Sequence, residues 1–201
     1  MNRCVVLFVE GETEVEFYKK LLSYVRNKAA NKRLDASIEC VNVKGVGGFK
    51  NIALRKFEKQ IRPKYIRKGG DCEFVIVLCR DTDVFEFSPK PPINWEDVTK
   101  EFKKIKVISK VIDIKAKHSI EDWFLVDLEG ILKYLKLPLN TKAIGGNGYK
   151  KMQNLFGKSN KMYYKGKRSN NFIESLNFEK IINDSYIKTQ LAGLFNELNI
   201  H

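Results

Sequence analysis

The first half of the chain alternates short apolar runs with segments of helical periodicity. Residues 3–9 form a β-rich run, and residues 12–24 then carry apolar side chains at helical spacing. The same order recurs as a strand at residues 37–43 and a helix at residues 49–61, which we expect Pro63 to stop. The pattern therefore predicts two consecutive strand–helix units.

The middle of the chain continues this alternation. Residues 73–79 are apolar after the first position, which predicts a central strand covered on both faces. After a proline-containing loop, a helix is expected to begin near Asn94, and residues 107–114 predict a fourth strand. Strands that alternate with helices form parallel sheets, so we predict an α/β, Rossmann-like fold with a mainly parallel four-stranded sheet flanked by helices.

The rest of the sequence predicts a helical C-terminal part. Helical patterns are present at residues 120–127, 128–135 and 185–198. A length of 201 residues allows one ordinary domain with a small appended lobe. We expect a core at residues 1–130 and a basic, mostly helical extension at residues 131–201 packed on that core.

Charge is distributed unevenly along the chain. Lys and Arg total 37 against 24 Asp and Glu, a formal net charge of +13, and residues 130–173 hold ten Lys or Arg with no Asp or Glu. Such a run attracts polyanions, which makes nucleic acid the leading partner class. The residues expected to contact it are Lys150, Lys151, Lys158, Lys161 and Arg168.

Aromatic residues are interleaved with these charges, and two interpretations of them stay open. They either offer faces on which unstacked bases can stack, or they form the core of the extension beneath a solvated face of lysines. The residues concerned are Tyr134, Tyr149, Phe156, Tyr163, Tyr164 and Phe172.

Cysteine usage and hydropathy exclude several classes of protein. The four cysteines form no CxxC pair and the chain has two histidines, so a structural zinc site is not expected. No apolar run approaches the ~20 residues of a membrane span, and the start of the chain is not typical of a signal peptide. We expect a cytoplasmic protein without a membrane partner.

Acidic residues follow two of the predicted strands. Glu10 follows the first predicted strand, with Glu14 four residues later, and Asp81 and Asp83 follow the third strand. Ligands of open α/β sheets bind beyond the carboxyl ends of the strands, so these side chains are expected to share one crevice. Carboxylate oxygens are suitable ligands for one or two Mg²⁺ or Mn²⁺ ions, so the first interpretation is a metal site. The alternative is that Asp81 and Asp83 only cap a turn.

These residues carry a resemblance to a known family. Residues 8–17 (FVEGETEVEF), with residues 81–83 (DTD) after a later strand, resemble a TOPRIM domain. The segment at residues 118–123 (HSIEDW) is similar to the TOPRIM nuclease domains of OLD-family proteins and of small relatives in phage-defence loci. The resemblance covers roughly the first 130 residues.

The resemblance implies roles for particular residues. The metal ligands it implies are Glu10, Glu14, Asp81, Asp83 and Glu121. Either Lys165 or Lys167 corresponds to the lysine that follows the acidic motifs and would act with these ligands in catalysis. Ser119 and His118 would support the ligands without contacting the metal.

The same resemblance implies a Mg²⁺- or Mn²⁺-dependent endonuclease that acts on DNA, with RNA as the alternative substrate, and a role in anti-phage defence. Such an enzyme hydrolyses phosphodiester bonds with water activated by the metal. A full OLD protein also carries an ATPase domain, which has no counterpart in these 201 residues. Its gating function is therefore expected to be absent or supplied by an ATPase partner protein.

Two other functions compete with this one. The first is a non-catalytic nucleic-acid-binding partner protein, which would use the basic residues, while its acidic residues would remain from an activity that has been lost. A HAD-type phosphohydrolase would use Asp81 as a phosphorylated nucleophile, since residues 81–84 (DTDV) imitate its motif. That fold normally has the motif on its first strand, and Glu10 would be unexplained. The sequence leaves the oligomeric state open.

Overall fold

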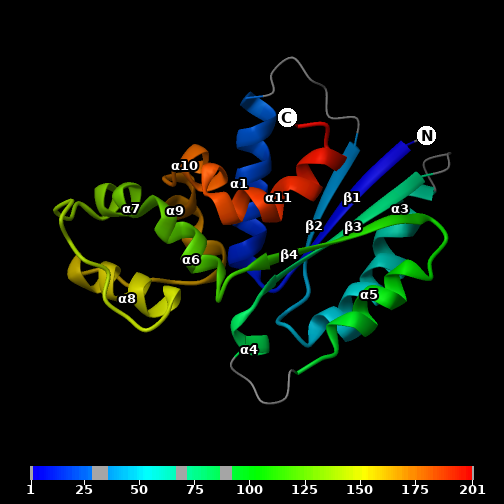
Figure 1. Ribbon diagram of the computed structural model, residues 1–201, viewed down its shortest axis with the longest axis horizontal. Helices are drawn as coiled ribbons and strands as arrows, with labels where there is room; N and C mark the ends of the chain where they lie inside the picture. The colour runs from blue at the N-terminus through cyan, green and yellow to red at the C-terminus, as the bar shows by residue number, and fades with distance from the viewer. Residues whose placement is uncertain (1, 29–35, 67–71, 87–91, 201) are drawn as a thin grey trace.

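A parallel sheet forms the centre of the molecule. The computed structural model describes residues 2–28, 36–66, 72–86 and 92–200. All neighbouring strands pair in parallel, in the order β2-β1-β3-β4 (Figure 1). The strands are β1 (Asn2–Val9), β2 (Ala36–Asn42), β3 (Cys72–Asp81) and β4 (Ile108–Ala116). The predicted α/β fold with a four-stranded parallel sheet is confirmed.

Helices connect these strands and form most of the C-terminal extension. The segments η1 and η2 are π-helical, and η3 and η4 are 3₁₀ turns. In chain order the helical segments are α1 (Glu12–Lys28), η1 (Phe49–Ala53), α2 (Leu54–Lys56), η2 (Phe57–Ile61), α3 (Arg62–Ile66), α4 (Asp83–Glu86), α5 (Trp95–Lys103), α6 (Ile120–Phe124), η3 (Leu125–Asp127), α7 (Leu128–Leu135), α8 (Gly148–Lys158), η4 (Gly166–Ser169), α9 (Asn170–Glu174), α10 (Phe178–Asn183) and α11 (Ser185–Glu197).

The two central strands are buried on both faces, which explains their continuous apolar sequences. Alternate residues of β1 contribute to different hydrophobic clusters: Val5 and Leu7 join one, while Val6 and Phe8 join the other. Side chains alternate across a strand, so a strand in the middle of three layers must be apolar at every position. Figure 1 shows α1 and α11 on one side of the sheet and α3 and α5 on the other.

The helical region that begins at η1 does not stop at Pro63, so this prediction is wrong. The chain stays helical to Ile66, and Pro63 is the second residue of α3. Just before it, the backbone N–H of Arg62 donates to the carbonyl of Phe57, the wider bond of a π-helical turn. In a regular α-helix a proline lacks the N–H donor and its ring crowds the carbonyl four residues earlier, so we attribute its tolerance here to the wider winding just before it.

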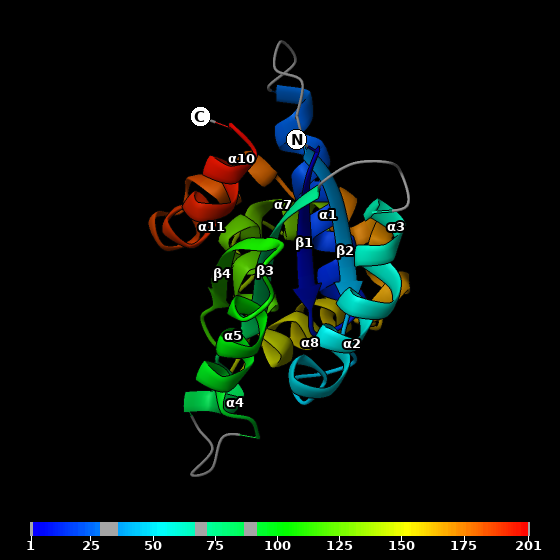
Figure 2. The same cartoon turned by 90° about the vertical axis from the view of Figure 1, so that its right-hand side faces the viewer.

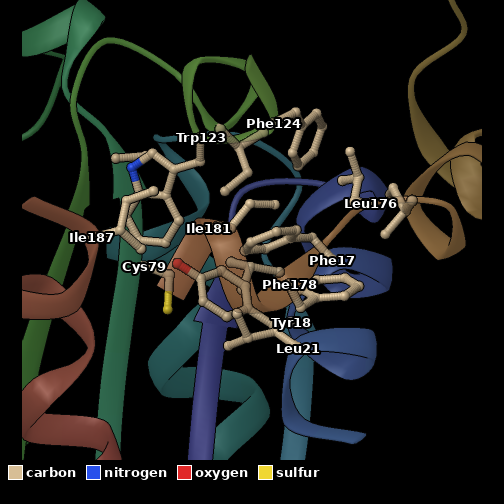
Figure 3. Close-up of a cluster of buried hydrophobic side chains, with 14 of the residues drawn as sticks. Phe17, Tyr18, Leu21, Cys79, Trp123, Phe124, Leu176, Phe178, Ile181 and Ile187 are labelled. Atoms are coloured by element: carbon tan, nitrogen blue, oxygen red, sulfur yellow. The ribbon is translucent and has the colours of Figure 1, made fainter. Parts of the chain in front are cut away.

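An aromatic cluster joins α1 to the C-terminal helices (Figure 3). The ring of Phe17 lies 5.4 Å from that of Phe124, 6.0 Å from that of Trp123 and 5.7 Å from that of Phe178, measured between centroids. These partners come from α6 and α10. The cluster therefore fixes the positions of α1 and α6 relative to each other.

Asp127 connects two helices of the C-terminal extension. Its buried carboxylate accepts a hydrogen bond from the N–H of Gly130 (3.2 Å) at the start of α7 and one from the N–H of Asn177 (2.8 Å), which precedes α10. A Cβ at position 130 would overlap this carboxylate, so the close approach requires glycine. Seen at right angles to Figure 1, α7 and α8 lie behind the sheet and α11 lies beside it (Figure 2).

No helix within the described ranges combines the length and the apolar character needed to cross a membrane.

Replacing Phe17 with alanine tests the aromatic cluster. The ring is fully buried, and its removal leaves a cavity between α1, α6 and α10. We expect Phe17→Ala to lower the free energy of unfolding by about 3 to 5 kcal/mol, measured by urea denaturation. The exposed Met162 serves as the control, since Met162→Ala is expected to change it by less than about 0.5 kcal/mol. Equal losses in both variants would contradict the role of the cluster.

Candidate functional site

The acidic residues that follow β1 and β3 meet at one edge of the sheet. The strands pair in parallel with Val9 opposite Cys79, so the next residues of both strands emerge together. The backbone N–H of Asp81, the last residue of β3, donates to Oε1 of Glu10 over 3.0 Å. Parallel pairing has therefore brought together carboxylates that are 71 residues apart in sequence.

Glu14 joins these two residues from the first turn of α1. Its carboxylate lies over Gly11, where an added Cβ would come within 3.0 Å of Oε2. Glu10, Glu14 and Asp81 line one small pocket, whose walls also include the side chains of Tyr18 and Ile120. The helix and the two strand ends thus place three acidic residues around one small pocket.

Burial and mutual repulsion make these carboxyl groups hard to ionise. Burial, with the nearby charges of Glu14 and Asp83, raises the pKa of Glu10 to about 7. Burial also raises the pKa of Asp81 well above its usual range, with Glu14 and Glu10 adding to the effect, and burial raises the pKa of Glu14. At neutral pH the group favours protonated carboxyls unless a cation compensates their charge.

Glu121 adds a fourth carboxylate from the first turn of α6. The residue is 0% exposed, and its charge raises the pKa of both Asp81 and Glu14. Its Oε1 accepts a hydrogen bond from the hydroxyl of Tyr163 (3.2 Å). Its Oε2 is buried and has no hydrogen-bond partner among the described residues. Glu10, Glu14, Asp81 and Glu121 together are the acidic cluster.

Of the two candidate lysines, Lys165 is the one that reaches the acidic cluster. Its Nζ lies 2.9 Å from Oε1 of Glu121, while its side chain remains 50% exposed. Burial lowers the pKa of Lys165, but the charges of Glu121, Glu14 and Asp81 outweigh it, so the net pKa is raised and the ammonium is favoured. Lys167 is exposed on η4.

The loop that carries Lys165 is tied to α1. The N–H of Gly166 donates to the hydroxyl of Thr13 over 2.7 Å, and Thr13 is buried in the first turn of α1. Gly166 has a φ of 85°, a left-handed conformation that a residue with a Cβ rarely adopts. Thr13 and Gly166 were not predicted as site residues, because a hydrogen bond between distant segments leaves no local signal.

Asp83, His118 and Ser119 lie in the segments that follow β3 and β4. The backbone N–H of Asp83 donates to the carbonyl of His118 (3.1 Å), and the N–H of His118 donates to Oγ1 of Thr82 (2.8 Å). These bonds hold the turn after β3 against the segment after β4. Ser119 is buried and donates from its hydroxyl to Oδ2 of Asp122 at the start of α6 (3.0 Å).

The carboxylates of the acidic cluster are chemically suited to a hard cation, but they are not arranged around a single metal position. Among residues 2–28, 36–66, 72–86 and 92–200, no group of three or more His, Cys, Asp or Glu side chains is arranged to hold a metal ion. Carboxylate oxygens are nevertheless the ligands that Mg²⁺ and Mn²⁺ prefer. The charge of Lys165 lowers the pKa of Glu10 and of Asp81 but does not outweigh burial, which keeps both raised. With Oε2 of Glu121 unpartnered among the described residues, one lysine only partly compensates the cluster.

The basic residues predicted to bind nucleic acid lie on α8 and the segment after it. Lys150 is exposed, and Nζ of Lys158 donates to the carbonyl of Lys142 (2.8 Å). Lys151 is partly buried on the same helix. Nζ of Lys161 lies 5.1 Å from the ring centroid of Tyr134, and the guanidinium of Arg168 lies 5.3 Å from that of Tyr164.

Most of the interleaved aromatic residues belong to the core of the extension. Phe156, Tyr163 and Phe172 are buried, and Tyr134 and Tyr149 pack against the same hydrophobic cluster. Tyr164 is 44% exposed, and its ring is in contact with Arg168. Of the two interpretations, the core reading holds for five of the six rings.

Arg80 is a further residue that the sequence pattern missed. Its guanidinium lies 4.5 Å from the ring centroid of Phe85 and 4.3 Å from that of Trp95, and it donates two hydrogen bonds to Asp113 (3.3 and 3.2 Å). These contacts connect the end of β3 to α4, α5 and β4. The charge of Arg80 is therefore paired with Asp113, beside the acidic cluster.

Comparison of the chain with protein-family models, with curated proteins and with solved structures gives no match.

Stability without metal should fall as the pH rises. The pKa of Glu10 is about 7 in the folded chain against an ordinary 4.5, so its contribution to stability is complete below pH 4.5 and is lost as the pH rises through 7. We expect the free energy of unfolding in EDTA, measured by urea denaturation, to decrease by on the order of 3 kcal/mol between about pH 5 and pH 8. Glu10→Gln should reduce this decrease, and the same slope in both proteins would contradict the assignment.

Proposed function

We propose that this chain is a Mg²⁺- or Mn²⁺-dependent nuclease of the TOPRIM type that hydrolyses phosphodiester bonds of nucleic acid. The observation that supports the proposal is the buried acidic cluster at the carboxyl ends of β1 and β3, with Lys165 directed at it. Carboxyl groups whose pKa values are strongly shifted by burial and by neighbouring charges, at the carboxyl ends of parallel strands, are candidates for a functional site. The TOPRIM assignment itself rests on the sequence motifs.

The acidic cluster would hold the metal. Glu10, Glu14 and Asp81, with Glu121 and Asp83 beside them, supply the oxygen ligands. A divalent cation bound there would supply a water of lowered pKa and a positive charge for the leaving oxygen. The raised pKa values imply that Glu10, Glu14 and Asp81 release protons when the cation binds, so metal affinity should increase with pH.

Lys165 would neutralise the scissile phosphate. Its ammonium is paired with Glu121 but its side chain is half exposed, so it can contact both the acidic cluster and a bound anion. A lysine held in this way stabilises the charge that develops on the phosphate oxygens. The hydrogen bond from Gly166 to Thr13 holds the loop, and hence Lys165, beside the carboxylates.

The basic segment, residues 130–173, would bind the substrate backbone. It contains ten Lys or Arg and no carboxylate, and it includes Lys165 itself. Lysine and arginine contacts to phosphates carry no base information, so we expect weak sequence preference and strong salt dependence. DNA is the substrate to examine first, with RNA as the comparison. We also propose a role in anti-phage defence together with an ATPase partner, and this part of the proposal is supported by the family resemblance alone.

A non-catalytic nucleic-acid-binding protein is the second candidate function. It is favoured by the finding that, in the part of the chain described, no three potential ligands converge on a metal position. In that case the basic segment would bind nucleic acid while the acidic cluster remained protonated. Metal-dependent cleavage separates the two candidates.

Plasmid and oligonucleotide cleavage tests the catalytic assignment. Purified protein should cleave DNA with Mg²⁺ or Mn²⁺ and not with EDTA, and Asp81→Asn should lower the rate by at least about 100-fold. Lys165→Met should lower it by about 100-fold as well, since it removes the charge that stabilises the phosphate. The matched variant Lys167→Met removes an exposed lysine two residues away and should change the rate far less. Binding without metal-dependent cleavage would favour the second candidate.

Salt dependence tests the basic segment. Each lysine that contacts a phosphate contributes about 0.7 to 0.9 to the slope of log K against log salt. We expect Lys150→Gln and Lys161→Gln each to flatten this slope by about that amount, measured by fluorescence anisotropy with a labelled oligonucleotide. Lys28 is a cation outside the segment that pairs with Glu179, so Lys28→Gln is the control. An unchanged slope in the first two variants would place the nucleic acid elsewhere.

A further inference from the structure

The carboxylate of Glu121 has one oxygen with donors and one without. Oε1 accepts a hydrogen bond from the hydroxyl of Tyr163 and lies 2.9 Å from Nζ of Lys165. Oε2 is buried and has no hydrogen-bond partner in the described part of the chain. Buried carboxylate oxygens are normally paired, and one without a partner requires an explanation.

We propose that Tyr163 is a positioning residue that holds Oε1 of Glu121 and so presents Oε2 to the divalent cation. The inference rests on the proposed function, because it assigns the unpartnered oxygen to the metal. It adds a residue that no motif indicates.

The position of the Tyr163 hydroxyl is determined by the packing of its ring. The ring is buried, with centroids 5.2 Å from that of Phe156, 5.8 Å from that of Tyr149 and 6.3 Å from that of Phe172. Burial and the charge of Glu121 raise the pKa of Tyr163, so the hydroxyl stays protonated and remains a donor. A ring held in this way places the donor with little rotational freedom.

The two donors on Oε1 differ in a way that separates their roles. Lys165 is half exposed and would have to turn toward the scissile phosphate, whereas Tyr163 lies in the core and stays in place. If Tyr163 did not hold Oε1, the Glu121 carboxylate would be free to rotate and to pair with Lys165 through either oxygen. The ammonium would then compete with the metal for both oxygens.

Glu121 lies within electrostatic reach of other carboxyl groups of the acidic cluster. The charge of Glu121 raises the pKa of Asp81 and of Glu14, so the carboxylate lies near both. Groups that orient a metal ligand without contacting the ion typically change metal affinity by 10- to 100-fold. Loss of the Tyr163 hydroxyl should therefore lower the affinity for metal more than it lowers the stability of the fold.

Mn²⁺ binding to the full chain, measured by isothermal titration calorimetry, tests the inference. Tyr163→Phe keeps the ring in the core and removes only the hydroxyl. We expect it to weaken Mn²⁺ binding by at least about 10-fold. Cleavage should require correspondingly more Mn²⁺, and saturating Mn²⁺ should restore most of the rate.

The control is Tyr149→Phe. The hydroxyl of Tyr149 accepts a hydrogen bond from Nε2 of Gln153 (3.1 Å), and its ring contacts that of Tyr163. The variant therefore removes a neighbouring phenolic hydroxyl from the group of rings that packs around Tyr163. We expect its Mn²⁺ affinity to equal that of the unaltered chain.

A double-mutant cycle separates positioning from a general effect on packing. If Tyr163 acts through Glu121, Tyr163→Phe has no further effect on Mn²⁺ affinity in a Glu121→Gln background. A further loss in that background, or equal Mn²⁺ affinity of Tyr163→Phe and the unaltered chain, would overturn the inference and leave the proposed function intact. Failure of the unaltered chain to bind Mn²⁺ would instead overturn the metal-dependent function together with the inference.

Discussion

The parallel pairing of β1 with β3, both buried on two faces, is the constraint on which the remaining structure depends. Because Val9 lies opposite Cys79, the strands end together, and Glu10 receives the N–H of Asp81. The apolar layers that make this pairing stable also exclude water from the carboxyl groups at its end. Desolvation is the largest cause of the raised pKa values of Glu10 and Asp81, so one packing arrangement accounts for both the fold and the electrostatics of the acidic cluster.

The carboxylates of the acidic cluster and the lysine that contacts them come from different parts of the sequence. The acids of the cluster come from residues before position 122, whereas the basic segment follows them and contains no carboxylate. Their junction is the pair Lys165 and Glu121, supported by Tyr163. The surrounding excess of positive charge favours approach of a polyanion, while the acidic cluster provides a place where only a cation is favourable.

The sheet and the convergence of Glu10 with Asp81 were predictable from sequence, because both follow from local periodicity and from the way parallel strands end. The choice of Lys165 over Lys167 was not predictable, since it depends on the left-handed conformation of Gly166 and its bond to Thr13. Tyr163 gave no signal that distinguished it from the other aromatic residues of the core. The expected stop at Pro63 failed because a π-helical turn before it accommodates the proline.

The hydrogen bond between Thr13 and Gly166 also bears on how the molecule is made. It joins residues 153 positions apart, so a ribosome has synthesised the acidic residues long before the segment that holds the lysine. A contact of such high sequence separation requires the closure of a long loop, which slows folding. The nascent chain therefore carries Glu10, Glu14 and Asp81 before Lys165, the cation that contacts their cluster, has been synthesised.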